Sequence, residues 1–383
     1  MLSRRFQRFK LIISGLIHER SNYHPADYFI VAAVFSIIIF GLIMLSSASS
    51  AISYASFQTS YFYFNHQLFG LALGLCLFFF LSRFDYHQYK KMALGLLIFS
   101  LLLLIVVFVP TLKAGWGHAR SWISIFGFSL QPSEIVKLTF LLYLAAWIEK
   151  RGKELVDLHH GTMPLVVLLG IVSLLMLLQP DTGTLFIMLL ISLAVYFVGG
   201  GNLKHITAIS FAGAIILFIM IKIAPYQMDR FRCFFDASYS PEEVCYQIDQ
   251  SLIAVGSGGF WGKGFGNSRQ KFRYLPEVQG DAIFPIIAEE TGFIFSVMLV
   301  LLYVFLFYRG WLVSQRAPDV YGRLIAIGIV TWFSAQAFIN IAGMINFIPM
   351  TGVPLPFVSY GGSAMMAALA AAGILVNVSK QTR

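Results

Sequence analysis

Ten long apolar runs constrain the fold of this chain more than any other feature. A transmembrane helix needs about 17 to 25 predominantly apolar residues, and runs of about this length recur along the whole sequence. Charged residues make up only 12% of the 383 residues, too few to cover the surface of a soluble core of this size. The sequence therefore predicts an all-α integral membrane protein with spans at residues 27–48, 66–82, 92–110, 132–148, 162–179, 183–200, 205–225, 282–308, 321–347 and 358–378.

These runs predict one transmembrane domain, residues 26–379, between a basic segment, 1–25, and a short tail, 380–383. The basic segment suits either a helix lying on an anionic leaflet or a tail that retains the N-terminus inside. The first run is long enough to be a retained signal anchor. One large hydrophilic insertion, residues 226–281, interrupts the runs, and we expect a functional external loop there because its many aromatic residues argue against disorder.

The distribution of lysine and arginine predicts the orientation. With the N-terminus inside, most cations fall in inward-facing segments, so both termini are expected to be cytoplasmic. The long insertion breaks this trend by carrying a cluster of cations: Arg230, Arg232, Lys263, Arg269, Lys271 and Arg273. A translocated basic cluster suggests an anionic substrate. The net charge of +9 is otherwise explained by membrane topology, so no nucleic-acid partner is predicted.

The stretch GKGFGNSRQKFRYLPEVQGDAIFPIIAEETG, residues 262–292, gathers glycines, cations and carboxylates just before an apolar run. Asp281 lies at the junction, where partial desolvation would raise its pKa toward that of a general base. Asp281 is therefore our candidate catalytic residue, although it could instead only cap the following helix. Lys263, Arg269 and Lys271 would supply positive potential near it.

The glycines that open this stretch, in GSGGFWGKGFGNS, lack the GK[ST] ending of a phosphate loop, so nucleotide binding is rejected. They would instead let the backbone approach a ligand or a neighbouring helix. Glu289 and Glu290 follow Asp281 by about two helical turns. We expect one of them to be a structural partner for a cation.

A second motif, ARSWISIFGFSLQPSEIVKL, leads into the fourth run. Pro132 suits the first turn of a helix, and Glu134 and Lys137, three residues apart, could pair on one face. Such a pair either belongs to a functional site or fixes the helix at the membrane interface. Arg120 and Trp122 suit interface anchors, and Arg120 could alternatively hold a phosphate.

Two further motifs carry polar groups between spans. In QPDTGT, Asp181 is expected to cap the next helix, with a cavity-lining role as the alternative. The stretch NFIPMTGVPLPFVSYGGSA breaks the approach to the last span, where non-helical backbone needs protein or a wet cavity around it. It could form an anion cradle or serve close helix packing through its small residues, which include Ser359, Tyr360, Gly361, Gly362 and Ser363.

Three cysteines complete the inventory of reactive groups. Cys76 lies inside an apolar run and is expected to pack as a small hydrophobic residue. Cys233 and Cys245 share the long insertion and could form a disulfide on an oxidising side of the membrane, or remain free. Two cysteines without clustered histidines make a weak case for zinc.

Together and in this order, the motifs resemble the SEDS family (shape, elongation, division and sporulation), the membrane-embedded peptidoglycan polymerases FtsW, RodA and SpoVE. The resemblance covers nearly the whole chain, from SSAS after the first span through RSWISIFGFSLQPSEIVKL, QPDTGT, YQIDQSLIAVGSGGFWGKGFGNSRQKFRYLPE and GVPLPFVSYGGSA. GFGNSRQKFRYLPE and MLSSASS look more like the division members, FtsW, whereas GVPLPFVSYGGSA leans toward the elongation members. The family usually has HTDFIF, but this chain has QGDAIF, with Gly280 in place of the threonine.

The resemblance implies an inverting glycosyltransferase that polymerises lipid II at the outer face of the bacterial cytoplasmic membrane during septal wall synthesis. Asp281 would be the general base, while Arg120, Lys137 and the basic insertion would meet the charge of the leaving diphosphate. A divalent metal, Mg²⁺ or Mn²⁺, is expected, with no organic cofactor. The implied partners are lipid II, the undecaprenyl-diphosphate-linked strand, a class B penicillin-binding transpeptidase, divisome proteins and membrane lipids.

Three alternatives stay open at this point. An elongation-type polymerase would use the same chemistry. A lipid II flippase or transporter also suits ten spans with broken helices, but it would favour mid-span charges and repeated halves. A non-catalytic scaffold for division proteins is the third possibility.

Overall fold

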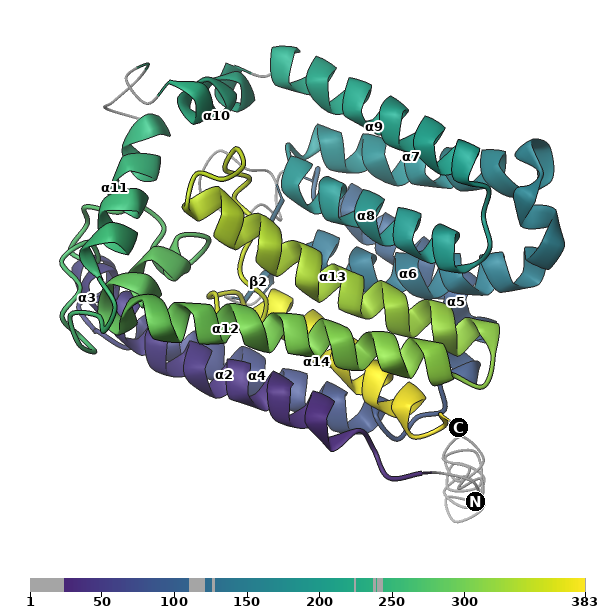
Figure 1. Ribbon diagram of the computed structural model, residues 1–383, viewed down its shortest axis with the longest axis horizontal. Helices are drawn as coiled ribbons and strands as arrows, with labels where there is room; N and C mark the ends of the chain where they lie inside the picture. Colours follow the sequence, from purple (N-terminus) through teal and green to yellow (C-terminus); the bar gives the residue numbers. More distant parts are fainter. Residues whose placement is uncertain are drawn as a thin grey trace.

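Long apolar helices run lengthwise through one bundle in the computed structural model, which describes residues 24–109, 121–125, 128–223, 225–236, 239 and 244–382 (Figure 1). The first half contains α2 (Tyr28–Ala48), α3 (Ser50–Phe57), α4 (Phe62–Leu81), α5 (His87–Val106), β1 (Ile123–Ile125), β2 (Phe128–Leu130) and α6 (Pro132–Arg151). A 3-10 turn, η2 (Gly152–Val156), and a π turn, η3 (Leu158–Thr162), follow. The second half contains α7 (Met163–Leu178), α8 (Thr182–Val198), α9 (Leu203–Ile223), α10 (Pro225–Phe235), α11 (Val244–Ser257), α12 (Ile283–Arg316), α13 (Val320–Met344) and α14 (Gly362–Ser379).

The prediction of an all-α membrane fold is confirmed, with the antiparallel β1–β2 hairpin as a small exception. Each of the ten predicted spans overlaps a helix. Eight helices in the described residues are long and apolar enough to cross a bilayer. Of the other two, α8 has 17 residues, and α6 carries charges at both ends. The count of ten crossings therefore stays a prediction.

The centre of the bundle is formed by α13 and α14. Their apolar windows are 72% and 83% buried, whereas that of α9 is 0% buried, so α9 lies at the periphery. Close approach at the centre depends on small residues, as in other membrane helix pairs. A Cβ on Gly373 of α14 would stand 2.7 Å from the backbone oxygen of Phe78 in α4, and α4 and α14 pack along their lengths.

Both described chain ends lie at the same end of the bundle, opposite α3, α10 and α11 (Figure 1). The backbone N–H of His24 donates a hydrogen bond to the carbonyl of Lys380 at 2.9 Å. Asp27, which caps α2, forms an ion pair with Arg309 of α12 at 2.6 Å. These contacts hold the start of α2 against the last turns of α12 and α14, which are predicted to face the cytoplasm. The expected orientation requires these three helix ends to lie on the same side of the membrane.

The insertion predicted as a loop contains two short helices, α10 and α11, followed by a run of turns up to Asp281. A disulfide between Cys233 and Cys245 joins these helices, with a Cα–Cα distance of 5.2 Å, so the open question of that bridge is answered. The interior position expected for Cys76 is wrong, because this thiol is exposed on α4. Most of α4 faces outward, where a small apolar group can face lipid at little cost.

A break in α12 explains the glycine-rich stretch. Gly292 interrupts the helix with φ 76° and ψ −174°, and a Cβ there would collide with the backbone of Gly262. The N–H groups of Lys263 and Gly264 donate to the carbonyls of Glu289 and Glu290, at 2.9 and 3.0 Å, and so satisfy groups that the break exposes. Gly262 and Gly258, whose Cβ atoms would meet the backbone of α12, therefore serve approach to a neighbouring helix.

Candidate functional site

Asp281 lies where the insertion meets α12, but it does not cap that helix. The N-cap residue is Ala282, without a side-chain cap, so the capping interpretation is wrong. Asn340 of α13 holds this point of the backbone, because its Nδ2 donates to the carbonyls of Asp281 and Val353, both at 2.8 Å. The Asp281 carboxylate is thus left available on a fixed backbone.

The Asp281 carboxylate converges with the guanidinium of Arg230 above Gly352. A Cβ on Gly352 would stand 3.5 Å from Asp281 Oδ2 and 3.3 Å from Arg230 Nη1. Arg230 comes from α10, is 8% exposed, and its Nη1 approaches the carbonyl of Met350 at 3.4 Å. Gly352 has φ +74°, so glycine both permits this backbone and leaves room for the two charged groups.

The electrostatics of Asp281 suit proton transfer. Burial raises the pKa of its carboxyl to about 6, Arg230 acts in the opposite direction, and the nearby carboxylate of Glu277 adds to the increase. The expected increase is therefore confirmed. Part of the residue stays accessible, while Oδ1 has no hydrogen-bond partner among the described residues. Such a group can accept a proton near neutral pH.

The last motif lines this region, but its backbone does not form the predicted anion cradle at residues 359–361. The N–H groups of Tyr360 and Gly361 donate to Gln279 O at 2.8 Å and to Gln67 Oε1 at 3.0 Å, and that of Ser359 donates to a neighbouring carbonyl. Close helix packing, the alternative, is observed at Gly362, because a Cβ on Gly70 of α4 would stand 2.6 Å from Gly362 Cα. An anion cradle at Gly362 and Ser363 stays a prediction.

Ser363 and Asp181 connect this motif to two other helices. Ser363 Oγ accepts from the backbone N–H of Gln131 at 3.2 Å. Asp181 accepts from the N–H of Thr184 at 3.2 Å, so its predicted role as the cap of α8 is confirmed. Its Oδ2 also accepts from Ser133 Oγ at 2.9 Å, which ties α8 to the first turn of α6.

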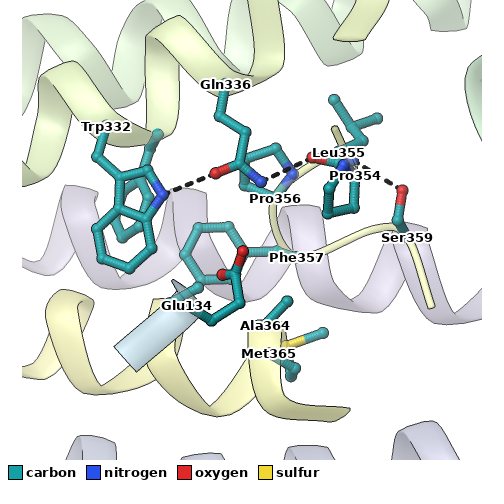
Figure 2. A pocket seen from close by; sticks show the side chains of 12 residues that line it. Glu134, Trp332, Gln336, Pro354, Leu355, Pro356, Phe357, Ser359, Ala364 and Met365 are labelled. Atoms are coloured by element: carbon teal, nitrogen blue, oxygen red, sulfur yellow. Dashed lines mark hydrogen bonds between the residues drawn. The ribbon is translucent and has the colours of Figure 1, made fainter. Parts of the chain in front are cut away.

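Glu134 and Lys137 form the predicted ion pair, at 2.7 Å, and are 2% and 1% exposed. Lys137 Nζ also donates to Gln336 at 2.9 Å and lies 4.7 Å from the centroid of the Trp332 ring. Figure 2 shows Glu134 facing Trp332, Gln336 and the segment Pro354–Phe357 across a small cavity. The pair therefore lies inside the bundle and does not fix α6 at the interface.

This cavity has a volume of about 10 Å³, roughly the space for one water. Gln336 connects its walls by accepting from Trp332 Nε1 at 2.7 Å and donating to Pro354 O at 2.8 Å. A substrate phosphate would need this region to open before it could contact Lys137. Direct contact between Lys137 and substrate stays a prediction.

Two of the predicted loop cations are already paired. Lys263 contacts Glu289 at 2.7 Å, and Lys271 contacts Glu290 at 3.1 Å and Ser47 Oγ at 2.9 Å. Both glutamates, rather than one, are structural partners for cations. Because these charges are neutralised locally, Lys263 and Lys271 contribute less positive potential at Asp281 than the sequence suggested.

Three predicted site residues remain, namely one further cation of the insertion and the two expected interface anchors. Arg269 is exposed, and its side chain makes no hydrogen bond or ion pair within the described ranges. Trp122 is half-buried beside Ser121, whose Oγ donates to Gln179 O at 3.0 Å. Arg120 lies outside the described residues.

Arg230, whose charge acts on Asp281, was not predicted to lie beside it. It was included only among the basic residues of the insertion expected to meet the diphosphate, because nothing local signals contact across about 50 residues. Asn340 was also missed. An amide inside an apolar run was the available signal, since buried polar groups between membrane helices usually have partners.

A metal-binding role can be tested against the donors present. No group of three or more His, Cys, Asp or Glu side chains that could hold a metal ion occurs in the described part of the chain. Glu277, in the turns before Asp281, is the other carboxylate whose charge acts at the site. It fits an ion held mainly by substrate phosphates, because Mg²⁺ commonly uses one or two carboxylates together with phosphate oxygens.

Comparison with known proteins gives consistent matches along the chain. The family model described as "Cell cycle protein", for FtsW, RodA and SpoVE, matches residues 27–383. Stage V sporulation protein E of Bacillus subtilis (strain 168) is 36% identical over 357 residues, covering 93% of this chain and 98% of the relative. The probable peptidoglycan glycosyltransferase FtsW of Nitrosomonas europaea is 36% identical over 375 residues, covering 96% of each.

Two solved structures share the fold. A chain from a study of the structural coordination of polymerization and crosslinking by a peptidoglycan synthase complex has a TM-score of 0.75 and 28% identity, covering 92% of this chain and 97% of its own length. The rod shape determining protein RodA of Thermus thermophilus has a TM-score of 0.69 and 28% identity, covering 93% and 97%. The chain belongs to the FtsW, RodA and SpoVE family of cell cycle proteins.

Proposed function

We propose that this protein is a peptidoglycan glycosyltransferase that polymerises lipid II, with Asp281 as the general base. The observation that carries the proposal is the proximity of the Asp281 carboxylate to a buried arginine just before the start of α12, the end of that helix away from the Asp27–Arg309 contact. Relatives named probable peptidoglycan glycosyltransferase FtsW, such as that of Nitrosomonas europaea, support the reaction class. The SEDS resemblance, together with the position of Asp281, supports its assignment as the base.

The proposed reaction is one displacement at a sugar carbon. Asp281 removes the proton from the 4-hydroxyl of an incoming lipid II, and the hydroxyl oxygen attacks the anomeric carbon of the lipid-linked strand. The new C–O bond forms as the bond to undecaprenyl diphosphate breaks, with inversion. The proton remains on Asp281 until it is released to solvent. A carboxyl whose pKa is about 6 is mostly ionised at pH 7 and still basic enough for this step.

Negative charge develops on the departing diphosphate, so cations must meet it. We assign this role to Arg120 and Arg269, with Lys137 accessible only after the cavity beside Glu134 opens. A divalent ion, Mg²⁺ or Mn²⁺, would neutralise the diphosphate when bound. Glu277 is the residue that would contact such an ion, since substrate phosphates would provide most of its ligands.

The proposed setting is the bacterial cytoplasmic membrane, with both termini in the cytoplasm and Asp281 at the outer face. The excess of lysine and arginine in the segments near the termini supports this orientation. A class B penicillin-binding transpeptidase is the proposed partner, because the similar chain from the synthase-complex study comes from work that couples polymerization to crosslinking. Septal wall synthesis with divisome proteins is the proposed role, since several relatives are named FtsW.

The test is polymerisation of lipid II by the purified protein with Mg²⁺ or Mn²⁺ and no transpeptidase. We expect glycan strands from the unaltered protein and none from Asp281→Asn. Asp249→Asn is the matched control, because it removes a carboxylate from α11 in the same insertion and should stay active. Full polymerisation by Asp281→Asn would remove Asp281 from the base role, while lipid II translocation without polymer would indicate a flippase instead.

A further inference from the structure

Arg230 and the Cys233–Cys245 disulfide together carry an inference that deepens the proposed function and rests on it. Arg230 is separated from Asp281 by most of the insertion, yet its guanidinium and the carboxylate meet above Gly352. The arginine is 8% exposed. A buried charge is costly unless a group of opposite charge lies near it. The Asp281 carboxylate is such a group for Arg230.

We propose that Arg230 is a positioning residue that keeps the Asp281 carboxylate ionised and oriented, and that the Cys233–Cys245 disulfide holds Arg230 in place. Arg230 would act through Asp281 rather than on the substrate. It is therefore distinct from the cations assigned to the departing diphosphate.

Asp281 and Arg230 lie close to the same backbone position. A Cβ on Gly352 would stand 3.5 Å from Asp281 Oδ2 and 3.3 Å from Arg230 Nη1. The Met350 carbonyl also accepts from Arg230 Nη1 at 3.4 Å. The same backbone segment, Met350 to Gly352, therefore holds the guanidinium close enough to the carboxylate for its charge to act on it.

The Cys233–Cys245 disulfide ties α10 to the neighbouring helix. Arg230 and Cys233 are three residues apart, so they lie on one face of this helix, and both are buried. The disulfide joins that face to Cys245 in the first turn of α11. The next helix is anchored in turn, because α11 packs on α12 and Ser251 Oγ lies 3.8 Å from Met344 Sδ of α13.

The other described contacts of α10 are mostly with neighbouring parts of the insertion and with a peripheral helix. Gln227 Nε2 donates to Thr182 Oγ1 of α8 at 3.1 Å, and α10 packs on α9, the peripheral helix, and on α11. A helix of 11 residues has little stability of its own. The disulfide is therefore a covalent cross-link that ties the helix carrying Arg230 to α11, which packs on the bundle that carries Asp281.

The charged groups around Asp281 determine whether its pKa rises or falls when Arg230 is replaced. Arg230 on α10 lowers the pKa of the carboxyl, and Glu277 in the preceding turns raises it. The other described neighbours, Asn340 on α13 and Gly352, do not titrate. Removing the arginine should therefore raise the pKa of Asp281, by about one unit for a charge at this range.

The test follows the titration of Asp281 in two ways. One is lipid II polymerisation as a function of pH. The other is the pH dependence of carbodiimide labelling at Asp281, measured by mass spectrometry, which requires no activity. For Arg230→Gln we expect both midpoints to move upward by about one pH unit, with the largest loss of rate at the acid end and recovery in Arg230→Lys.

Arg232→Gln is the matched control, because Arg232 lies two residues away on α10 and its guanidinium contacts Tyr239 at the exposed side. It should leave both midpoints unchanged. The double variant Cys233→Ser/Cys245→Ser, and the unaltered protein after reduction, should shift them in the same direction as Arg230→Gln. Cys76 is the other thiol, and Cys76→Ser serves as its control.

Several outcomes would overturn the inference. A uniform loss of rate in Arg230→Gln, with both midpoints unmoved, would reduce Arg230 to a structural role. A higher KM for lipid II without a shift would make it a substrate contact instead. An unshifted double cysteine variant would remove the disulfide from the proposal. Failure of the unaltered protein to polymerise lipid II would refute the proposed function, whereas the labelling midpoints would still test the contact between Arg230 and Asp281.

Discussion

Breaking the buried pair between Glu134 and Lys137 should cost more stability than removing it altogether. Lys137→Met leaves the Glu134 carboxylate, 2% exposed, without the cation that lies 2.7 Å away. An uncompensated buried charge typically costs about 3–5 kcal/mol of unfolding free energy. Replacing both charges, in Glu134→Gln/Lys137→Met, should fall within about 1 kcal/mol of the unaltered protein or exceed it, because the desolvation cost of both ions then disappears.

The measurement is a denaturant titration of detergent-solubilised protein for both single variants and the double variant, from which the coupling energy is obtained. The more exposed pair between Lys90 and Glu149, at 2.5 Å with side chains 45% and 21% exposed, provides the control. Lys90→Met should cost less than about 1 kcal/mol because solvent screens that pair. A Lys137→Met cost as small as the control, or a double variant as unstable as Lys137→Met, would refute the reasoning.

Four further predictions follow from particular groups. Polymerisation should fall as pH decreases through about 6, where Asp281 becomes protonated, and a profile flat between pH 5 and 8 would contradict this. Because the folded pKa of Asp281 lies above its unfolded value, its ionisation destabilises the fold as pH rises through that range, so Asp281→Asn should melt higher than the unaltered protein at pH 7.5 and equally at pH 4. Gly292→Ala should lower expression and melting temperature sharply, since the new methyl group would meet the Gly262 backbone, whereas Gly95→Ala on α5, where a Cβ meets open space, should not. Asn340→Leu should reduce the polymerisation rate more than the melting temperature by freeing the Asp281 carbonyl, and equal losses would argue for packing alone.

The sequence predicted the helices well because membrane crossing imposes a length and an apolar composition that can be counted directly. It also predicted local contacts, such as the Glu134–Lys137 pair and the Asp181 cap, because both partners lie within one or two helical turns. Position along the chain and residue type were sufficient for those contacts.

Long-range contacts were the part that could not be predicted. The glycine-rich stretch predicted close backbone approach, but its sequence did not identify the break at Gly292 in α12 as the segment that it approaches. Lys263 and Lys271 were predicted to act near Asp281, yet they pair with glutamates beside that break. Charge and composition identify a basic segment, whereas only the packing of the helices decides which cations are already neutralised.

Lys263 and Lys271 pair with glutamates, whereas Arg230 acts on Asp281, and this difference affects how Asp281 can act as a base. A general base needs a pKa high enough to accept a proton and low enough to be ionised before substrate arrives. Burial alone would raise the pKa of Asp281 further, and a fully solvated arginine would be too screened to oppose it. Arg230 is buried beside the segment around Gly352, so its charge opposes the effect of burial on the pKa of Asp281 at short range. The loop lysines meanwhile stabilise the broken α12, so the structural and electrostatic functions of the basic insertion are carried by different residues.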